Sequence, residues 1–201
     1  TGTMKLLIAS NNANKAREIK QILGTRYTEI VTLQDAGIDI DVVEDGLTFM
    51  ENAVKKAETV LAFSGYNAVL ADDSGLCVDA LGGAPGIFSA RYAGEGHNDA
   101  DNNAKLISDM AGVSDDRRSC RFVSAVALAR KDRPTLCAEG HVEGRLLHES
   151  RGSNGFGYDP YFYYEPFGAS FAELSAEQKN AVSHRRRALE NLNERLKAED
   201  A

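Results

Sequence analysis

The sequence predicts an α/β fold, in which helices flank a mixed β-sheet that is divided into two lobes. Three observations favour this fold. Short apolar runs of strand length alternate with amphipathic helical stretches in the first third of the chain. Two long strand-like stretches follow in its middle. Helical patterns then return near its end, without any internal repeat or low-complexity linker.

The elements of the first half are marked by apolar runs and by helix caps. Thr48 with Glu51 forms a capping box, the clearest helix start in the chain. In order, we expect a strand over Met4–Ala9, a helix over Lys15–Leu23 closed by Gly24, a strand near Glu29–Leu33, a helix from Thr48 to Gly65, and a strand over Asn67–Ala71 that ends at Asp72-Asp73-Ser74-Gly75.

The second half begins with a glycine-rich loop around Gly82–Gly86. Ser175 with Gln178 forms a second capping box further on. We expect a helix over Asn98–Met110, long strands over Cys120–Arg130 and Thr135–Leu147 with a turn at Asp132–Pro134, a loop over Arg151–Pro160, a short strand over Tyr161–Tyr164, a helix from Ser175, and a last helix from Ser183 with an apolar stripe.

Length and composition are those of one globular domain. The chain has 201 residues, of which 43% are hydrophobic and 26% charged. A chain of this length buries roughly 70% of its unfolded surface, so it needs no disulfide or metal to fold. We expect residues 4–201 to form a single two-lobed domain, because Thr1–Thr3 before Met4 look like an expression remnant.

Location and large partners are constrained by what the sequence lacks. No apolar run reaches the ~20 residues of a membrane span, and no signal peptide precedes Met4, so we expect a cytoplasmic protein without a membrane partner. The net charge of −7 argues against a nucleic-acid polymer. A small polyanion that carries its own Mg²⁺ needs only a few local cations. Cys77, Cys120 and Cys137 form no CxxC pair and are expected to be reduced thiols.

The segment Ser10–Lys15 joins a buried strand to a helix and is a candidate phosphate site. Amide groups at a helix N-terminus attract phosphate, and Lys15 adds a positive charge. The segment is not a Walker A loop, because the spacing GxxxxGK[ST] is absent. The simpler interpretation is an asparagine-capped helix.

The pair Asp72-Asp73 at a predicted strand end is a candidate metal and catalytic site. Mg²⁺ prefers hard oxygen ligands, and a carboxylate can orient or deprotonate an attacking water. The alternative is an ordinary turn, since Asp, Ser and Gly favour turns. Glu44 or Asp45, in an acidic loop, could add a ligand. On the following helix, Asn52 and Lys56 share one face because they are four residues apart.

Two later segments could contact a base. The run Gly155-Phe156-Gly157-Tyr158-Asp159-Pro160 combines flexible glycines with rings that could stack on a purine. Ser183-His184-Arg185 opens the last helix, where donors could reach a base edge or a phosphate. Many tight turns resemble the first segment, and His184 alone would indicate no function.

Together these segments resemble the inosine triphosphate pyrophosphatase family, the XTP/dITP diphosphatases, from Lys5 to about Leu196. The most specific segments are, in order, Glu44-Asp45-Gly46-Leu47-Thr48-Phe49, Glu51-Asn52-Ala53, Ala71-Asp72-Asp73-Ser74-Gly75-Leu76, Gly82-Gly83-Ala84-Pro85-Gly86, Ser89-Ala90-Arg91-Tyr92, Gly155 to Pro160 and Ser183-His184-Arg185. The resemblance implies an elongated mixed β-sheet flanked by helices, two lobes with a nucleotide cleft between them, and a homodimer.

The resemblance also implies the site residues. Asp73 would be the catalytic proton acceptor, and Glu44 with Asp73 would bind Mg²⁺, with Asp72 nearby. The substrate-binding residues would be Ser10, Asn11, Asn12, Ala13, Asn14 and Lys15 with Lys56 at the triphosphate, Ser74, and Phe156, Gly157, Tyr158, Asp159, Lys179, His184 and Arg185 at the base and sugar end.

One departure concerns the phosphate loop. The family loop commonly reads T/S-G-N-x-G-K, whereas this chain has Asn11 and Asn14 at the two glycine positions. Asparagine adopts the left-handed glycine conformation at some cost, so we expect phosphate binding to survive.

The implied function is hydrolysis of non-canonical purine nucleoside triphosphates, dITP, ITP and XTP, to the monophosphate and pyrophosphate, which removes aberrant purines from the nucleotide pool. The 6-oxygen of the purine would select the substrate through donors from His184, Arg185 or loop amides near Phe156. One alternative is a pyrophosphatase for other modified nucleotides, such as a pyrimidine triphosphate. Another is a non-catalytic nucleotide-sensing module, which the retained Asp72, Asp73 and Glu44 disfavour.

Overall fold

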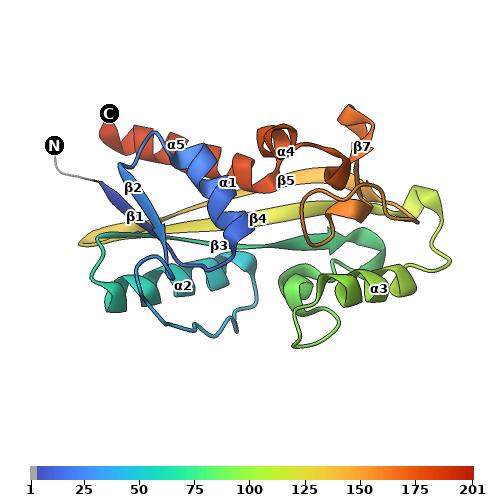
Figure 1. Ribbon diagram of the computed structural model, residues 1–201, viewed down its shortest axis with the longest axis horizontal. Coiled ribbons are helices and arrows are strands. Elements are labelled where there is room, and N and C mark those ends of the chain that lie inside the picture. The colour runs from blue at the N-terminus through green and yellow to red at the C-terminus, as the bar shows by residue number, and fades with distance from the viewer. Residues whose placement is uncertain (1–3) are drawn as a thin grey trace. The chain divides into compact units, whose positions relative to one another are not determined.

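The computed structural model describes residues 4–201, so the prediction about Thr1–Thr3 lies outside the described residues. One seven-stranded sheet has the strand order β2-β1-β3-β4-β5-β6-β7 (Figure 1). The strands are β1 Lys5–Ile8, β2 Glu29–Thr32, β3 Ala68–Val78, β4 Ser119–Arg130, β5 Arg133–Leu146, β6 Phe162–Tyr164 and β7 Ala169–Ser170. The helices are α1 Ala13–Leu23, α2 Phe49–Ser64, α3 Asp99–Asp109, α4 Ala176–Val182 and α5 His184–Asp200.

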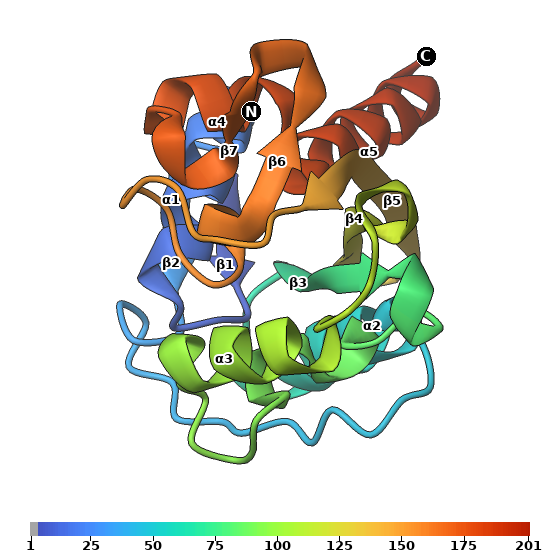
Figure 2. The same cartoon turned by 90° about the vertical axis from the view of Figure 1, so that its right-hand side faces the viewer.

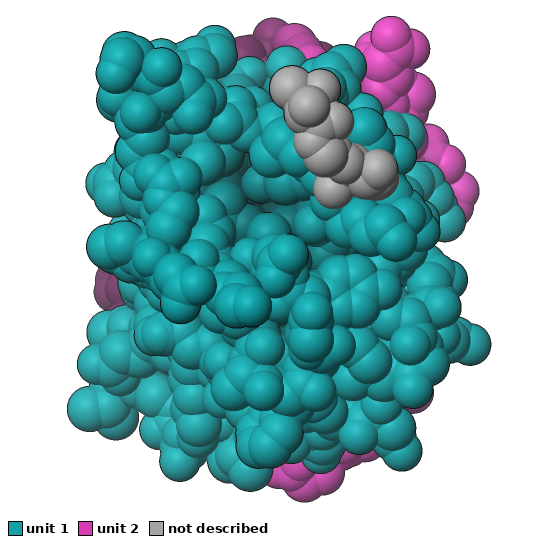
Figure 3. All heavy atoms as spheres, turned by 90° about the vertical axis from the view of Figure 1, so that its left-hand side faces the viewer, with its two compact units in different colours: residues 1–73, 124–140, 185–201 teal, residues 74–123, 141–184 magenta. Residues whose placement is uncertain are grey.

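The sheet is mixed, as predicted. Strand β1 pairs in parallel with β2 and β3, whereas β6 pairs antiparallel with β5 and β7. The chain divides into two compact units, coloured in Figure 3. Unit 1 comprises residues 1–73, 124–140 and 185–201, and unit 2 comprises residues 74–123 and 141–184. Strands β3, β4 and β5 contribute residues to both units.

Helices cover both faces of the sheet in unit 1 (Figure 1). Because side chains alternate along a strand, Leu6 and Ile8 face one side and Leu7 the other. Leu6 and Ile8 pack in one buried cluster with residues of α1 and α5, including Ile19. Leu7 packs in a second cluster with residues of α2, including Ala53. The two faces therefore place α1 and α5 on one side and α2 on the other.

Unit 2 has its own apolar core, and its elements α3 and β6 are labelled in Figure 2. Leu76 and Val78 of β3 pack with Leu106 of α3, and the same cluster contains Phe162 of β6. The centroids of the Phe122 and Phe162 rings lie 4.5 Å apart. Aromatic contacts thus dominate a core that is separate from the two aliphatic clusters of unit 1.

The predicted helix caps are confirmed with one difference. The Thr48 hydroxyl accepts from the Glu51 amide at 3.0 Å, but the Glu51 carboxylate accepts from the amide of Leu47 and not from Thr48. The reciprocal half of the first capping box is therefore shifted by one residue. Ser175 and Gln178 form both bonds of the second box. Among the described residues, no helix is both long and apolar enough to cross a membrane.

Candidate active site

The acidic pair lies inside a strand, which corrects the prediction that the strand ends at Asp72 and excludes the alternative of an ordinary turn. Strand β3 runs to Val78, so Asp72 and Asp73 are strand residues, 6% and 7% exposed. Successive side chains in a strand point to opposite faces. Asp72 therefore shares the face of Leu70 with α1 and α5, and Asp73 faces α2. The two carboxylates consequently have different neighbours.

Asp72 is surrounded by donors from three elements. Its carboxylate lies 2.9 Å from the Lys15 ammonium of α1 and accepts from the Ser124 hydroxyl of β4 at 2.5 Å. The Arg185 guanidinium of α5 lies 3.4 Å away. Burial raises the pKa of Asp72, but the Arg185 and Lys15 charges outweigh burial and hold that pKa well below its usual range. Asp72 is therefore ionised at neutral pH and serves as an anchor for cations.

Arg185 is held by two carboxylates. Its side chain is 1% exposed and forms ion pairs with Asp72 and with Glu18 of α1. Burial lowers the pKa of Arg185, yet the two carboxylate charges raise it above its usual value. The structure therefore places Arg185 beside the acidic pair in unit 1. Its predicted contact with the base stays a prediction.

Asp73 has the environment of a general base. It accepts a hydrogen bond from the Asn52 side chain of α2 at 3.1 Å. Burial, and next the negative charge of Glu44, raise the pKa of Asp73 to about 6. Asn52 also accepts from the Gly46 amide at 2.7 Å, so one side chain fixes both Asp73 and the acidic loop.

Lys56 links the acidic loop to β3. It contacts the same two segments as Asn52, as expected for residues that share one face of α2. Its ammonium forms an ion pair with Glu44 and lies 3.4 Å from the Asp72 carbonyl oxygen. Asp45 instead pairs at 2.7 Å with Lys55, and both side chains are largely exposed. Glu44 rather than Asp45 therefore belongs with Asp73 and Lys56.

The donor set fits a magnesium ion that is bound together with phosphate. No group of three His, Cys, Asp or Glu residues in the described part of the chain forms a metal cage. Mg²⁺ usually takes one or two carboxylates, several waters and substrate phosphates. Glu44 and Asp73 supply two hard carboxylates close enough for the Glu44 charge to raise the pKa of Asp73. Two carboxylates of this kind suit Mg²⁺ that is bound together with a phosphate, and they do not form a preformed metal cage.

The predicted phosphate loop is an asparagine-capped helix start. Helix α1 begins at Ala13, two residues before the predicted start, and the Asn12 side chain accepts from the amides of Asn14 and Lys15 at 3.0 and 3.2 Å. The Asn11 side chain accepts from the Gln34 amide at 2.8 Å. A phosphate would take the place of the Asn12 carboxamide at these amides.

The asparagines at the family's glycine positions carry no left-handed strain. Within residues 4–201, the only non-glycine residues with positive φ are His97 and Asp132. Asn11 and Asn14 therefore do not need the glycine-like conformation that we expected. The substitution is accommodated by ordinary backbone geometry.

In unit 2, the loop Gly155–Pro160 folds around one buried ion pair. The Lys179 ammonium of α4 lies 2.7 Å from an Asp159 carboxylate oxygen, and the two side chains are 6% and 4% exposed. The same oxygen accepts from the Phe156 amide at 3.1 Å. The ammonium lies 4.4 Å from the centroid of the Phe156 ring. A Cβ atom at Gly155 would lie 2.2 Å from that oxygen, so only glycine fits.

Helix α3 holds the tip of this loop. The Gly157 amide donates to the Asp99 carboxylate, and the Gly157 carbonyl accepts from the Asn103 side chain, both at 2.9 Å. The Tyr158 hydroxyl donates to the Ser89 carbonyl at 2.6 Å. The backbone N–H and C=O groups of Gly157 are therefore both hydrogen-bonded to side chains of α3.

The remaining predicted residues of unit 2 are Ser74 and His184. Ser74 is half-buried in β3, directly after Asp73. The His184 ring is 5% exposed and stacks on Phe122, with centroids 4.8 Å apart and planes at 17°. His184 is thus part of an aromatic stack. Its predicted contact with the base stays a prediction.

Comparison with known proteins decides the family. The model of the Ham1 family matches residues 6–195. The chain belongs to the Ham1 family. A dITP/XTP pyrophosphatase of Clostridium perfringens is 48% identical over 198 residues, which cover 96% of this chain and 97% of that protein.

Solved Ham1 structures have the same fold. The Ham1 protein of Staphylococcus aureus superposes with a TM-score of 0.85 at 40% identity, and covers 97% of this chain and 99% of its own. A Ham1 protein of Coxiella burnetii gives a TM-score of 0.86 at 38% identity, with the same coverage. The predicted fold class and family resemblance are confirmed.

Several contacts of this Ham1 chain were missed by sequence reasoning. Glu18 follows Lys15 by three residues and is therefore on the same helix face, a signal that could have found it. Asp99 and Asn103 are polar residues four apart on α3 and had a similar signal. Ser124 lies in an apolar stretch of β4, and nothing in the spacing singled it out.

Proposed function

We propose that this Ham1 protein hydrolyses non-canonical purine nucleoside triphosphates, dITP, ITP and XTP, to the monophosphate and pyrophosphate, and so removes aberrant purines from the nucleotide pool. The observation that carries this proposal is Asp73, a buried carboxylate whose pKa is raised to about 6. Relatives named dITP/XTP pyrophosphatases, matched over nearly the whole chain, support the substrate class.

In the proposed reaction, Asp73 accepts a proton from a water molecule. The water oxygen forms a bond to the α-phosphorus, the bond from that phosphorus to the bridging oxygen breaks, and pyrophosphate leaves. A base with a pKa near 6 is unprotonated at neutral pH and still basic enough to take the proton. Asn52 holds the carboxylate oxygen in place for this transfer.

The charges of unit 1 would act on the triphosphate. Lys15 and Lys56 supply the positive side chains, and Asp72 anchors Lys15 at 2.9 Å. Mg²⁺, which Glu44 and Asp73 would hold, supplies further positive charge to offset the phosphates when it is bound. A few fixed charges of this kind stabilise a departing pyrophosphate more than bulk water does.

The base and sugar would be bound by residues of unit 2. The Phe156 ring offers a face for stacking, and the Lys179 ammonium above it offers donors for a purine 6-oxygen. Adenine presents an amino group at that position, which meets such donors unfavourably. Asp73 of unit 1 is followed directly by Ser74 of unit 2, and His184 of unit 2 by Arg185 of unit 1. The residues proposed for the triphosphate and those proposed for the base are therefore joined by the chain at these two points.

The test is an incubation with dITP, XTP, dGTP and dATP, with and without Mg²⁺, in which pyrophosphate and orthophosphate are measured separately. We expect Mg²⁺-dependent pyrophosphate from dITP and XTP only. In water enriched in ¹⁸O, the label should enter the monophosphate. Orthophosphate as the first product, or label in pyrophosphate, would refute attack at the α-phosphorus. Binding without any turnover would favour the sensing module.

The cytoplasmic location and the homodimer belong to the same proposal. Light scattering of the purified protein would measure its mass in solution. A mass of twice 21.8 kDa is expected. A monomer at concentrations where the enzyme is active would refute the dimer.

A further inference from the structure

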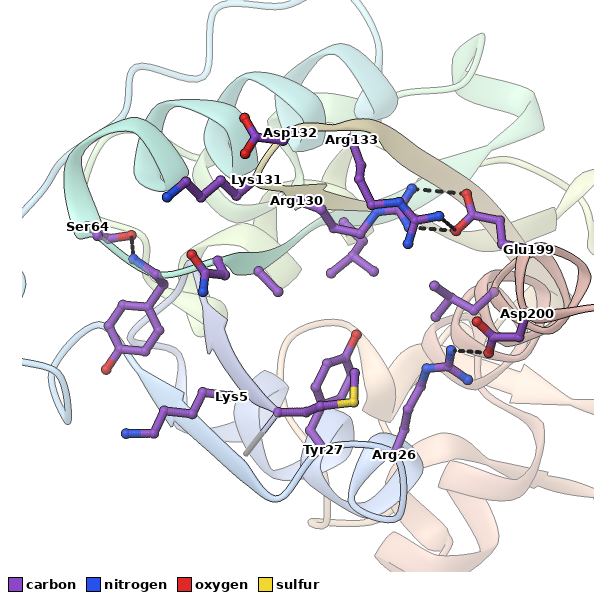
Figure 4. Close-up of a pocket in the computed structure, with 17 residues that line it drawn as sticks. Lys5, Arg26, Tyr27, Ser64, Arg130, Lys131, Asp132, Arg133, Glu199 and Asp200 are labelled. Atoms are coloured by element: carbon purple, nitrogen blue, oxygen red, sulfur yellow. Dashed lines mark hydrogen bonds and ion pairs between the residues drawn. The ribbon is translucent and has the colours of Figure 1, made fainter. Parts of the chain in front are cut away.

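A pocket of about 920 Å³ opens in unit 1, far along the strands from the proposed catalytic residues. It is lined at the amino ends of β1 and β3 by Lys5 and Ala68, whereas Ser10 and Asp72 lie toward the carboxyl ends of these parallel strands. Figure 3 shows a hollow in this face of unit 1, and Figure 4 shows the lining. The pocket is therefore distinct from the proposed active site.

The lining is positively charged, although the whole chain carries −7. Five cationic side chains meet three carboxylates there, for a formal charge of +2. The cations are Lys5, Arg26, Arg130, Lys131 and Arg133, and the carboxylates are Asp132, Glu199 and Asp200. A local excess of cations in an acidic protein favours an anionic ligand.

Two of the arginines retain donors that the described residues do not satisfy. Arg130 pairs with Glu199 at 2.6 Å and Arg26 with Asp200 at 3.0 Å. The Nε atoms of Arg26 and Arg130 are nevertheless buried and have no hydrogen-bond partner among the described residues. The Arg130 side chain is only 9% exposed. A buried N–H group without a partner is costly, so Glu199 and Asp200 do not satisfy the two guanidinium groups fully, and both arginines retain capacity for a further acceptor.

The rest of the lining is apolar and includes an aromatic ring. Tyr27, Leu128 and Leu196 are at most 7% exposed. In Figure 4 the Tyr27 hydroxyl points into the pocket, between Arg26 on one side and Arg130 on the other. A ligand here would meet cationic donors and the Tyr27 hydroxyl, and the half-buried Tyr66 offers it an aromatic ring.

We propose that this pocket binds a small phosphorylated molecule with a flat ring system, of the nucleoside monophosphate class. Arg26 and Arg130 would hold the phosphate, and the half-buried ring of Tyr66 would pack against the ligand ring. The volume lies within the roughly 300–1,000 Å³ of small-molecule sites. This site is independent of the proposed function, because none of its lining residues belongs to the phosphate, metal or base sets.

The test is an NMR titration of the whole protein with AMP, whose 6-amino group makes it a poor ligand for the proposed active site. We expect the amide signals of Tyr27, Asn67 and Lys131 to shift, and those of Asn14 and Lys15 to stay. Parallel titrations use inorganic phosphate and adenosine. Both should bind more weakly than AMP, since each contacts only part of the lining.

The variant Arg26→Gln should weaken AMP binding about tenfold, because it removes a charged hydrogen-bond donor. The matched control is Arg117→Gln, an exposed arginine of unit 2. If Arg26→Gln melts at a lower temperature than the wild type, Lys131→Gln replaces it, with a smaller loss expected. Shifts confined to Asn14 and Lys15, equal weakening by Arg117→Gln, or phosphate binding as tight as AMP binding would each overturn the proposal.

Discussion

The two units each contain a buried lysine–carboxylate pair, and the pairs differ in their surroundings. In unit 1, Lys15 and Asp72 lie 2.9 Å apart, and Asp72 also meets Ser124 and Arg185. In unit 2, Lys179 and Asp159 lie 2.7 Å apart, and the same carboxylate oxygen accepts from the Phe156 amide.

This difference teaches what each pair can do. The Asp72 network joins two cations, Lys15 and Arg185, to two carboxylates, Asp72 and Glu18. Lys15 is its most exposed member, so a polyanion can reach that cation. The Asp159 pair is electrically balanced and is bonded to the Phe156 amide, so its role is to shape a loop. We infer that unit 1 carries the turnover and that unit 2 carries the choice of base.

The largest expected effect is that of Asp73→Asn. Without the base, kcat for dITP should fall about 10²–10⁴-fold, because that is the usual contribution of general-base catalysis. The KM should change little, since the amide keeps the shape of the carboxylate. Steady-state kinetics measures both. The control is Asp45→Asn in the exposed pair, and near-normal turnover of Asp73→Asn would remove Asp73 from its role.

The next effect is on the free energy of unfolding, and it distinguishes the ion pair of unit 2 from the network of unit 1. Lys179→Met removes the ammonium from a buried carboxylate and should lower the free energy of unfolding by about 3–5 kcal/mol. The double variant Lys179→Met/Asp159→Asn should recover most of that loss, because both charges are gone. Urea unfolding followed by circular dichroism checks this.

The corresponding double variant in unit 1 should not recover. Arg185→Met/Asp72→Asn leaves Glu18 buried without its guanidinium and Lys15 without its carboxylate. We expect the loss of about 3–5 kcal/mol to persist in urea unfolding. Full recovery would show that the unit 1 network is as simple as the unit 2 pair.

A smaller effect is expected at the loop tip. Asn103→Ala removes the donor to the Gly157 carbonyl and should raise the KM for dITP about fivefold with kcat nearly unchanged, since roughly 1 kcal/mol of positioning is lost. Asp101→Ala on the exposed face of α3 is the control. An equal fall in kcat would mean that α3 supports the fold in general and not the base loop.

The smallest effect is expected for Lys55→Met, which removes an exposed ion pair. Surface pairs contribute little, so kcat/KM should stay within about twofold of the wild type. Its neighbour Lys56 pairs with Glu44 and should behave differently, with Lys56→Met lowering kcat/KM for every triphosphate. Equal kinetics for the two variants would contradict the assignment of Lys56.

The sequence predicted every strand of the described structure except β7, the five helices and most caps, because these depend on local patterns such as Thr48 with Glu51. The sequence also predicted that the strand ends at Asp72-Asp73, since local composition cannot show that a polar pair continues a strand. That difference decides the site: only in a strand do the two carboxylates face opposite sides. Contacts between distant segments, such as Ser124 with Asp72, depend on packing and have no signal in spacing alone.

The central claim is that unit 1 carries the turnover and unit 2 the choice of base. The most direct measurement is the ratio of kcat/KM for dITP to that for dATP, in Lys56→Met and in Lys179→Met/Asp159→Asn. We predict that Lys56→Met lowers both values and preserves the ratio, and that the unit 2 variant lowers the ratio by at least about tenfold. A ratio that collapses in Lys56→Met and survives in the unit 2 variant would contradict the account.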